Sequence, residues 1–193
     1  MKIAVIGKGN AGTALGSGLM RAGHEIRFGH RDPKEPVADA VSWGEVLILA
    51  VPFPGVPEAV LEIGSRADGK TLIDVTNPLD SSLDLAVGFS TSAAEELQKM
   101  LPRAHVVKAF NTVFAQNQDS GNVSGQQLTA FIAGDDPGAL KTVTGLAEDI
   151  GFDPVVVGSL HYARYLEPMA VMIIRMAYKG NMGTKMGYKL IKG

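Results

Sequence analysis

A glycine-rich turn close to the N-terminus carries the residues best suited to chemistry. Gly7, Gly9 and Gly12 form the pattern G-x-G-x-x-G directly after the apolar run 2–6 and directly before a helical pattern. Gly7 permits a tight turn, Gly9 lets the backbone approach a diphosphate, and Gly12 lets the helix pack on the strand. The free amides at the helix start favour an anion. The residues expected to bind it are Gly7, Gly9, Asn10, Ala11, Gly12 and Thr13.

An isolated match to this pattern is more often a simple turn, but the flanking strand and helix favour dinucleotide binding. The second expected strand, residues 25–29, is followed directly by His30 and Arg31. A carboxylate there would bind the ribose diol of NAD, whereas a basic group accepts the 2′-phosphate of NADP. His30, Arg31 and Lys34 therefore predict NADP, although Arg31 and Lys34 could instead solvate a loop. Asp32 precedes Pro33 and is expected to cap a helix.

Composition excludes several other classes of function. The 193 residues include 18 Lys and Arg against 20 Asp and Glu, a net charge of −2, so no nucleic-acid partner is expected. The absence of cysteine excludes disulfides, thiolate metal ligands and cysteine nucleophiles, and favours a cytoplasmic location. The apolar run 168–174 is far shorter than a bilayer span, so no membrane association is expected.

Short apolar runs alternate with longer amphipathic segments, and this pattern predicts the elements that position the turn. The expected strands cover residues 2–6, 25–29, 46–51, 71–75, 105–110, 128–133 and 154–157. The expected helices cover residues 12–22, 54–65, 91–100, 137–150 and 165–178. The fold class is therefore α/β, a Rossmann-type, doubly wound, mostly parallel sheet with a C-terminal helical extension, in a single domain over 1–193.

Two further local features are visible in the sequence. Asp136-Pro137 repeats the pattern of an N-cap followed by proline at the first helical position. The segment 111–127 is rich in Asn, Gln, Gly and Ser and has no expected structure.

No side chains stand out as a catalytic or metal-binding group. His24, His105 and His161 are scattered without metal-ligand spacing, and each is interpreted as structural. No His/Asp or Tyr/Lys pairing is apparent. Neither a catalytic residue nor a metal site is therefore predicted, and the expected chemistry is hydride transfer between stacked rings.

The second ring is expected in the crevice beyond the strand ends. Only 35 residues follow residue 158, which is too few for a separate substrate domain. The segments 51–54, 76–79 and 109–112 lie at the predicted strand ends and are mostly apolar. Such a wall suits a planar redox ring better than a small polar substrate.

Motifs spread over the whole chain resemble one family of NADPH-dependent oxidoreductases. The family contains the NADP reductases of coenzyme F420, an 8-hydroxy-5-deazaflavin, and the cytosolic domain of STEAP-type metalloreductases. The matching motifs are the G-x-G-N-x-G turn, Gly23-His24-Glu25-Ile26, Gly29-x-Arg31, Asp74-Val75-Thr76-Asn77-Pro78, Val106-Val107-Lys108-Ala109-Phe110-Asn111-Thr112, Ala133-Gly134-Asp135-Asp136 and Gly158-Ser159-Leu160. Between Pro33 and Val46 the chain is shorter than is usual in the family.

The resemblance implies roles for further residues. His30, in place of the serine usual in the family, would hold the 2′-phosphate together with Arg31. Residues implied to flank the nicotinamide and its ribose are Val51, Pro52, Asn77 and Pro78, with Phe53 in the same wall. Residues implied to face the second redox ring are Ala109, Phe110 and Asn111. The C-terminal segment 160–193 would contribute to the acceptor site, to a dimer interface or to both.

The last expected helix also has two interpretations. Met169, Met172 and Met176 make it apolar on nearly every face, so it is either core or shared between two subunits of a homodimer. A homodimer is the expected assembly.

Three functions remain open from the sequence. The leading hypothesis is hydride transfer between NADP(H) and a planar ring, either the deazaflavin coenzyme F420 or a flavin such as FMN or FAD. The alternatives are a flavin-mediated ferric or quinone reductase and a non-catalytic NADP(H)-sensing module. A small-molecule redox cofactor is the expected substrate in both enzyme hypotheses.

Overall fold

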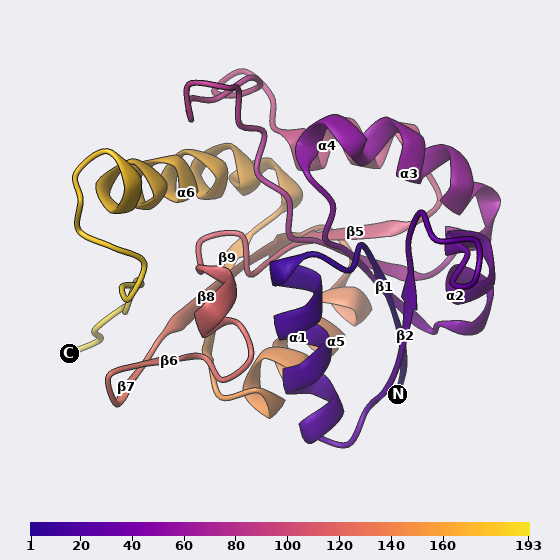
Figure 1. The fold of residues 1–193 in the computed structure, drawn as a ribbon, viewed down its shortest axis with the longest axis horizontal. Coiled ribbons are helices and arrows are strands. Elements are labelled where there is room, and N and C mark those ends of the chain that lie inside the picture. The colour runs from indigo at the N-terminus through magenta and orange to yellow at the C-terminus, as the bar shows by residue number, and fades with distance from the viewer.

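The computed structural model describes residues 1–193, and its centre is one seven-stranded sheet (Figure 1). The strands are β1 (Lys2–Ile6), β2 (Glu25–Gly29), β3 (Val46–Leu49), β4 (Thr71–Asp74), β5 (His105–Lys108), β8 (Thr129–Gly134) and β9 (Asp153–Gly158). They lie in the order β2-β1-β3-β4-β5-β8-β9. β1 to β5 are mutually parallel, whereas β8 is antiparallel to β5 and parallel to β9. The predicted α/β class with a mostly parallel sheet is confirmed.

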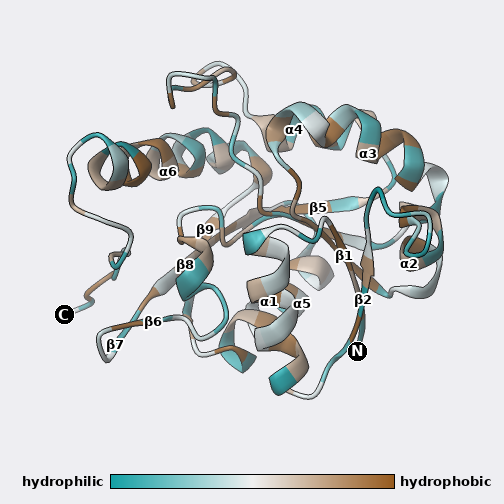
Figure 2. Ribbon diagram, in the orientation of Figure 1, coloured by the Kyte–Doolittle hydropathy of each residue, from teal (hydrophilic) through white to brown (hydrophobic).

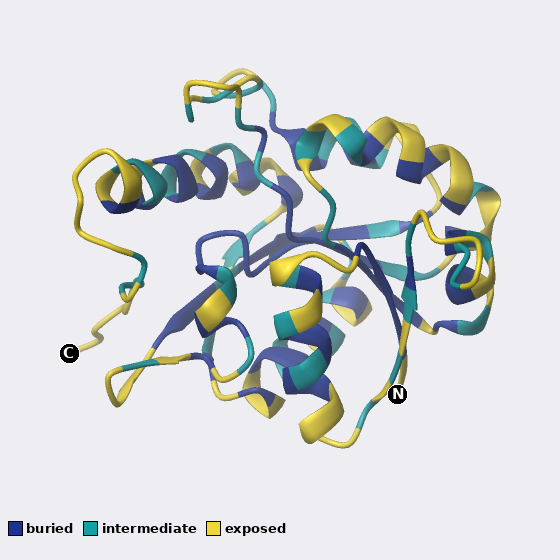
Figure 3. Cartoon of the chain, viewed as in Figure 1, coloured by how far each residue is buried: buried dark blue, intermediate teal, exposed yellow.

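Helices cover both faces of this sheet, so the fold is doubly wound as predicted. They are α1 (Asn10–Arg21), α2 (Val37–Trp43), α3 (Val56–Ile63), α4 (Ala93–Met100), α5 (Pro137–Asp149) and α6 (Ala163–Tyr178). α1 and α5 pack on the face that includes Val5 and Ile48, and α2, α3 and α4 pack on the face that includes Ala4 and Leu47. Alternate strand residues therefore face opposite layers, and the central strands are apolar and buried (Figures 2 and 3).

The predicted helix start at Asp32-Pro33 is wrong. α2, which was not among the expected helices, begins at Val37. The Asp32 carboxylate instead accepts a hydrogen bond from the Lys34 amide at 3.0 Å and closes a turn. After this turn α2 packs tightly on the end of β2, where a Cβ atom on Gly29 would lie 2.8 Å from the Cα atom of Val37.

The second Asp-Pro pair does begin a helix. The Asp136 carboxylate accepts a hydrogen bond from the Ala139 amide at 2.7 Å, with Pro137 in the first turn of α5. The segment 111–127, expected without structure, contains three short elements. They are a 3₁₀ turn at Ala115–Asn117 and the paired strands β6 (Asn122–Val123) and β7 (Gln126–Gln127). Elements of two or three residues are too short to leave a periodic pattern in a sequence.

A buried ion cluster ties the sheet to two helices. Lys108, the last residue of β5, is fully buried, and its Nζ atom lies 2.9 Å from Asp74 Oδ2 in β4 and 3.0 Å from Glu167 Oε1 in α6. The same ammonium donates to the Thr76 carbonyl oxygen at 2.6 Å. The Glu167 carboxylate also accepts hydrogen bonds from two amides at the N-terminus of α4, at 2.9 and 3.1 Å. Thus β4, β5, α4 and α6 meet at one cluster.

The three charges in this cluster stabilise one another. Burial alone would lower the pKa of Lys108, but the charges of Asp74 and Glu167 and their hydrogen bonds outweigh burial and raise the pKa above its usual value of 10.5. The lysine therefore remains protonated. The amides and the positive dipole end of α4 offset the second carboxylate. Because removing any one of these charges would leave the others buried without a counter-ion, the ends of β4 and β5 are held in a fixed relation to α6.

The C-terminal helix and tail fold back onto α4 and β8. The Arg164 guanidinium in α6 makes two hydrogen bonds of 2.8 Å to the Glu95 carboxylate in α4. Beyond α6 the tail turns towards β8 (Figure 1), where the Thr129 amide donates to the Tyr188 carbonyl oxygen at 2.9 Å. None of the helices combines the length and the apolar character needed to cross a membrane.

Replacing the buried cation should strongly destabilise the fold. We expect Lys108→Met to lower the free energy of unfolding by about 3–5 kcal/mol, because two buried carboxylates lose their counter-ion. Chemical denaturation followed by circular dichroism measures the loss. Lys99→Met is the matched control, because Lys99 pairs with Glu96 on the exposed face of α4, and a change of less than about 1 kcal/mol is expected there. Equal losses in the two variants would contradict a stabilising role for the cluster.

The same cluster predicts a pH dependence of stability. The pKa of Lys108 is raised in the folded chain, so its contribution is complete below the unfolded value of 10.5 and is lost as the pH rises through the higher folded value. The difference in unfolding free energy between the wild type and Lys108→Met should therefore be constant near neutral pH and narrow in strong alkali. A difference that widens in alkali would show that the cluster does not hold a protonated lysine.

Candidate functional site

A cleft with a volume of about 660 Å³ lies at the carboxyl ends of β1, β2 and β3. Its floor is the glycine-rich turn, and its sides are the loop after β2 and the start of α3. The predicted site residues that line it are Gly7, Gly9, His30, Arg31, Val51 and Pro52. Residues that line it without having been predicted include Lys8, Gly29, Val37, Glu58 and Glu62. The structure thus brings the turn, the end of β2 and the segment after β3 into one cleft.

The three glycines of the turn have different physical roles. Gly7 has a φ of +105°, and a Cβ atom there would lie 2.4 Å from the Ala50 carbonyl oxygen. A Cβ atom on Gly12 would lie 2.2 Å from the Gly7 carbonyl oxygen. A Cβ atom on Gly9, by contrast, would meet no protein atom within 4 Å. Gly7 and Gly12 are therefore required by the fold, whereas the space at Gly9 is open to a ligand.

The start of α1 is suited to holding an anion. Its N-cap is Gly9, no side chain caps it, and its first turn contains no acidic residue, so the first amides and the positive dipole end are available. Asn10 and Thr13 line a second groove of about 550 Å³ on the outer side of α1, next to the cleft. Ala11 is half-buried behind them. The open space at Gly9 and the uncapped amides together fit the diphosphate of a dinucleotide.

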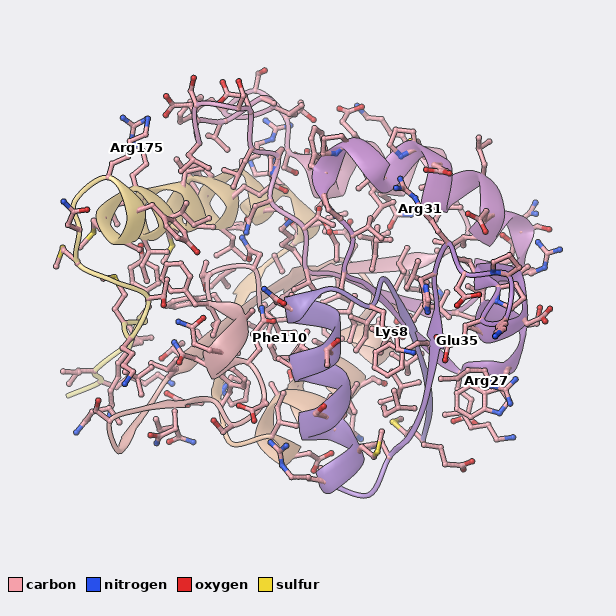
Figure 4. The ribbon with its side chains drawn as sticks, in the orientation of Figure 1. Lys8, Arg27, Arg31, Glu35, Phe110 and Arg175 are labelled. Carbon is pink, nitrogen blue, oxygen red and sulfur yellow. The ribbon has the colours of Figure 1, made fainter.

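Charged side chains gather where β2 ends. The Lys8 Nζ atom lies 2.7 Å from Glu35 Oε2, and the His30 ring contacts the same carboxylate oxygen. Arg31 donates to Glu58 of α3 at 2.9 Å. Figure 4 shows Lys8 and Glu35 together beside β1 and β2, with Arg31 nearer to α3. The hydrogen bonds and charges of Lys8 and His30 lower the pKa of Glu35, so its carboxylate is ionised at neutral pH.

One predicted phosphate contact, Lys34, lies outside the cleft. Lys34 lines a shallow depression on the other side of the loop with Arg27 and Phe28, so it does not join His30 and Arg31. Lys34 was the expected second cation; in the structure Lys8, which was not predicted, is the second lysine-type cation candidate at the cleft, bonded to Glu35. The sequence contains one indication of this role. Lys8 lies between Gly7 and Gly9, and a side chain at that position of the turn can point towards the end of β2.

The expected nicotinamide edge is built by two asparagines that bind each other. The Asn77 Nδ2 atom donates to the Asn111 carbonyl oxygen at 2.9 Å, and Asn111 Nδ2 donates to Asn77 Oδ1 and to the Leu166 carbonyl oxygen, both at 3.0 Å. Pro78, next to this pair, is buried. Phe53 is half-buried and lines a separate apolar pocket of about 160 Å³ with Thr76. The ends of β4 and β5 are thus joined to α6 at this edge.

The side chain of Phe110 does not form a wall for a second ring. It is 2% exposed and packs against Phe152, with the ring centroids 5.5 Å apart. Its backbone φ is +61°, a strained value for a residue that is not glycine. Ala109 is also fully buried. These two residues direct the chain so that Asn111 meets Asn77, and no pattern in the sequence indicates this left-handed turn.

Two of the three histidines interpreted as structural, His24 and His105, lie beside aspartates. His24 pairs with Asp149 at 3.0 Å, and His105 lies 3.7 Å from Asp136. No group of three or more potential metal ligands is assembled anywhere in the structure. The polar groups present at the start of α1 and at the Asn77 edge are backbone amides and side-chain amides.

Comparison with known proteins places these features in one family. The model for "NADP oxidoreductase coenzyme F420-dependent" matches residues 2–78. An F420-dependent NADP reductase of Methanothermobacter marburgensis is 31% identical, over 94% of this chain and 95% of that protein. The metalloreductase STEAP3 of Rattus norvegicus is 30% identical over 90% of this chain. The match spans only 37% of the length of STEAP3. A structure from Arthrobacter sp. FB24, assigned provisionally as an F420-dependent NADP reductase, superposes over both full chains with a TM-score of 0.92 and 28% identity.

The different roles of the glycines can be tested by substitution. We expect Gly9→Val to keep the stability of the wild type but to abolish NADPH binding, because its side chain would fill the open space over the start of α1. Gly12→Val should unfold the domain, because its side chain would collide with the backbone at Gly7. Thermal denaturation and calorimetric titration distinguish the two effects. Normal NADPH binding by Gly9→Val would refute the assignment of the diphosphate site.

Proposed function

The chain belongs to the family of NADP oxidoreductases that depend on coenzyme F420, and we propose that it transfers a hydride between NADP(H) and the deazaflavin ring of F420. The observation that carries this proposal is the cleft that runs from the charges at the end of β2, over Gly9, to Val51 and Pro52. The match over nearly the full length of an F420-dependent NADP reductase supports it.

In this proposal the dinucleotide lies across the carboxyl ends of the strands. The open backbone at Gly9 and the first amides of α1 hold the diphosphate. Arg31, with His30 and Lys8 beside it, holds the 2′-phosphate. Val51-Pro52 and the Asn77 edge flank the nicotinamide and its ribose.

When both are bound, the nicotinamide and the deazaflavin supply the redox chemistry themselves, since a hydride passes directly from one ring to the other. The chain's own residues bind and orient the two rings. The hydrogen bonds between Asn77 and Asn111 and the buried Lys108 cluster make this edge rigid. A rigid edge favours the separation of about 3–3.5 Å between reacting atoms that efficient transfer requires.

A homodimer is part of the proposal. α6 was expected to be apolar on nearly every face, and the structure divides it into two sides. Ile173 is buried against Phe114, whereas Met172 and Met176 are 52% and 39% exposed. We propose that the exposed methionines pack against a second copy, and that the segment 160–193 helps to enclose the acceptor. Analytical ultracentrifugation of the full chain tests this assembly.

A second function is favoured by one observation. The 30% identity with a metalloreductase covers 90% of this chain. The same cleft and edge would serve a chain that passes the hydride to FMN or FAD and from there to ferric iron or a quinone.

Anaerobic oxidation of NADPH tests the proposal against this alternative. Absorption at about 340 nm is followed with F420, FMN, FAD and a ferric chelate as separate acceptors. Rapid oxidation with F420 alone is expected. Oxidation of NADPH only with a flavin would support the metalloreductase-like function instead. Absence of NADPH oxidation with every acceptor would support an NADP(H)-sensing module. Gly9→Val is the control for oxidation that does not depend on the cleft.

The 2′-phosphate assignment predicts a selective effect at Arg31. We expect Arg31→Ala to raise the Kd for NADPH about tenfold, because a charged hydrogen-bond donor to the phosphate is lost, and to leave the Kd for NADH within about twofold. Calorimetric titration with both nucleotides measures the two constants. Arg27→Ala is the matched control, since Arg27 stacks on Trp43 at 4.6 Å, away from the cleft. Equal effects of Arg31→Ala on both nucleotides would overturn the assignment.

A further inference from the structure

The cations at the end of β2 are already neutralised by carboxylates of the chain. Lys8 and His30 share the carboxylate of Glu35, and Arg31 is paired with Glu58. A phosphate that binds these cations must compete with carboxylates for the same donors. The two pairs differ in exposure, because Arg31 is 80% exposed and Glu58 60% exposed, whereas His30 and Glu35 are 24% and 38% exposed.

The backbone holds Glu35 in place. The His30 amide donates to the Glu35 carbonyl oxygen and the Glu35 amide donates to the Asp32 carbonyl oxygen, both at 2.9 Å. The loop is therefore closed on itself, with the Glu35 side chain directed back over the end of β2. Lys8 reaches the same point from the glycine-rich turn, with its Nζ atom 5.4 Å from the centre of the Phe28 ring. Two independent segments thus meet at one carboxylate.

We propose that Glu35 is an internal competitor for the 2′-phosphate of NADP(H), and this inference rests on the proposed function of the cleft. In the free chain its carboxylate takes the place of a phosphate oxygen between Lys8 and His30. When the nucleotide binds, the phosphate displaces the carboxylate from both donors. Glu35 therefore weakens the binding of NADP(H), but not of NAD(H), and so sets how strongly the chain discriminates between them.

The neutral isostere Glu35→Gln tests the competition. It keeps the size of the side chain and removes the charge that competes for Lys8 and His30. We expect the Kd for NADPH to fall about threefold to fivefold, the upper range for a partly exposed ion pair, while the Kd for NADH changes less than twofold. Titration calorimetry at one fixed ionic strength gives both constants, and thermal denaturation verifies that the variant is folded.

Glu62→Gln is the matched control. Glu62 lines the same cleft, but its carboxylate pairs with no cation in the structure. If direct competition operates, the ratio of the Kd for NADPH to the Kd for NADH in Glu62→Gln stays within about twofold of the ratio in the wild type. If Glu35→Gln and Glu62→Gln gain NADPH affinity equally, the gain arises from the overall negative charge of the cleft. That result would overturn the proposal. Weaker NADPH binding by Glu35→Gln would also overturn it, since Glu35 would then orient the cations for the phosphate.

Lys8→Met separates this inference from the proposed function. If the 2′-phosphate binds where proposed, Lys8→Met raises the Kd for NADPH and not that for NADH. If Lys8→Met binds NADPH more weakly but NADH normally, and Glu35→Gln shows no gain in NADPH affinity, the phosphate site is supported. The role of Glu35 as a competitor is then refuted. If Lys8→Met and Arg31→Ala each change the Kd for NADPH and the Kd for NADH by the same factor, the phosphate site itself is refuted.

Discussion

The contact between the buried ammonium of Lys108 and the carboxylates of Asp74 and Glu167 is the constraint on which the rest of this structure depends. A lone charge at that depth would be prohibitively costly, so all three groups must be in place together. Lys108 also binds the carbonyl group that precedes Asn77, and the residue before Glu167 accepts a hydrogen bond from Asn111. One electrostatic cluster therefore positions both asparagines of the expected nicotinamide edge.

The two ends of the proposed dinucleotide site differ in character. At the Asn77 edge the polar groups are bonded to one another, and the backbone is held by the sheet and α6. At the end of β2 the charges of Lys8, Arg31 and Glu35 are partly exposed, and in the proposed competition they exchange partners when the phosphate binds. A rigid end favours alignment of the reacting rings, and an adaptable end favours binding and release of the nucleotide. Such a division suits a reaction that depends on proximity.

Patterns that are local in the sequence predicted most of the fold. The seven strands follow from apolar runs, and the phosphate turn follows from glycines with a strand before them and a helix after them. Asp32-Pro33 was misleading, because the same two residues can begin a helix or close a turn. The pairing of Lys8 with Glu35 spans 27 residues, and the buried side chain of Phe110 depends on a left-handed backbone. Neither a distant contact nor a strained turn leaves a local signal.

Direct passage of a hydride between the two rings is the central claim, and deuterium labelling tests it. NADPH that carries deuterium at the transferable position of carbon four is mixed anaerobically, in a single turnover, with this chain and oxidised F420 in normal water. Direct transfer predicts that the deuterium appears in the reduced deazaflavin, as measured by mass spectrometry. Deuterium lost to the solvent, or NADPH left unoxidised, would contradict it.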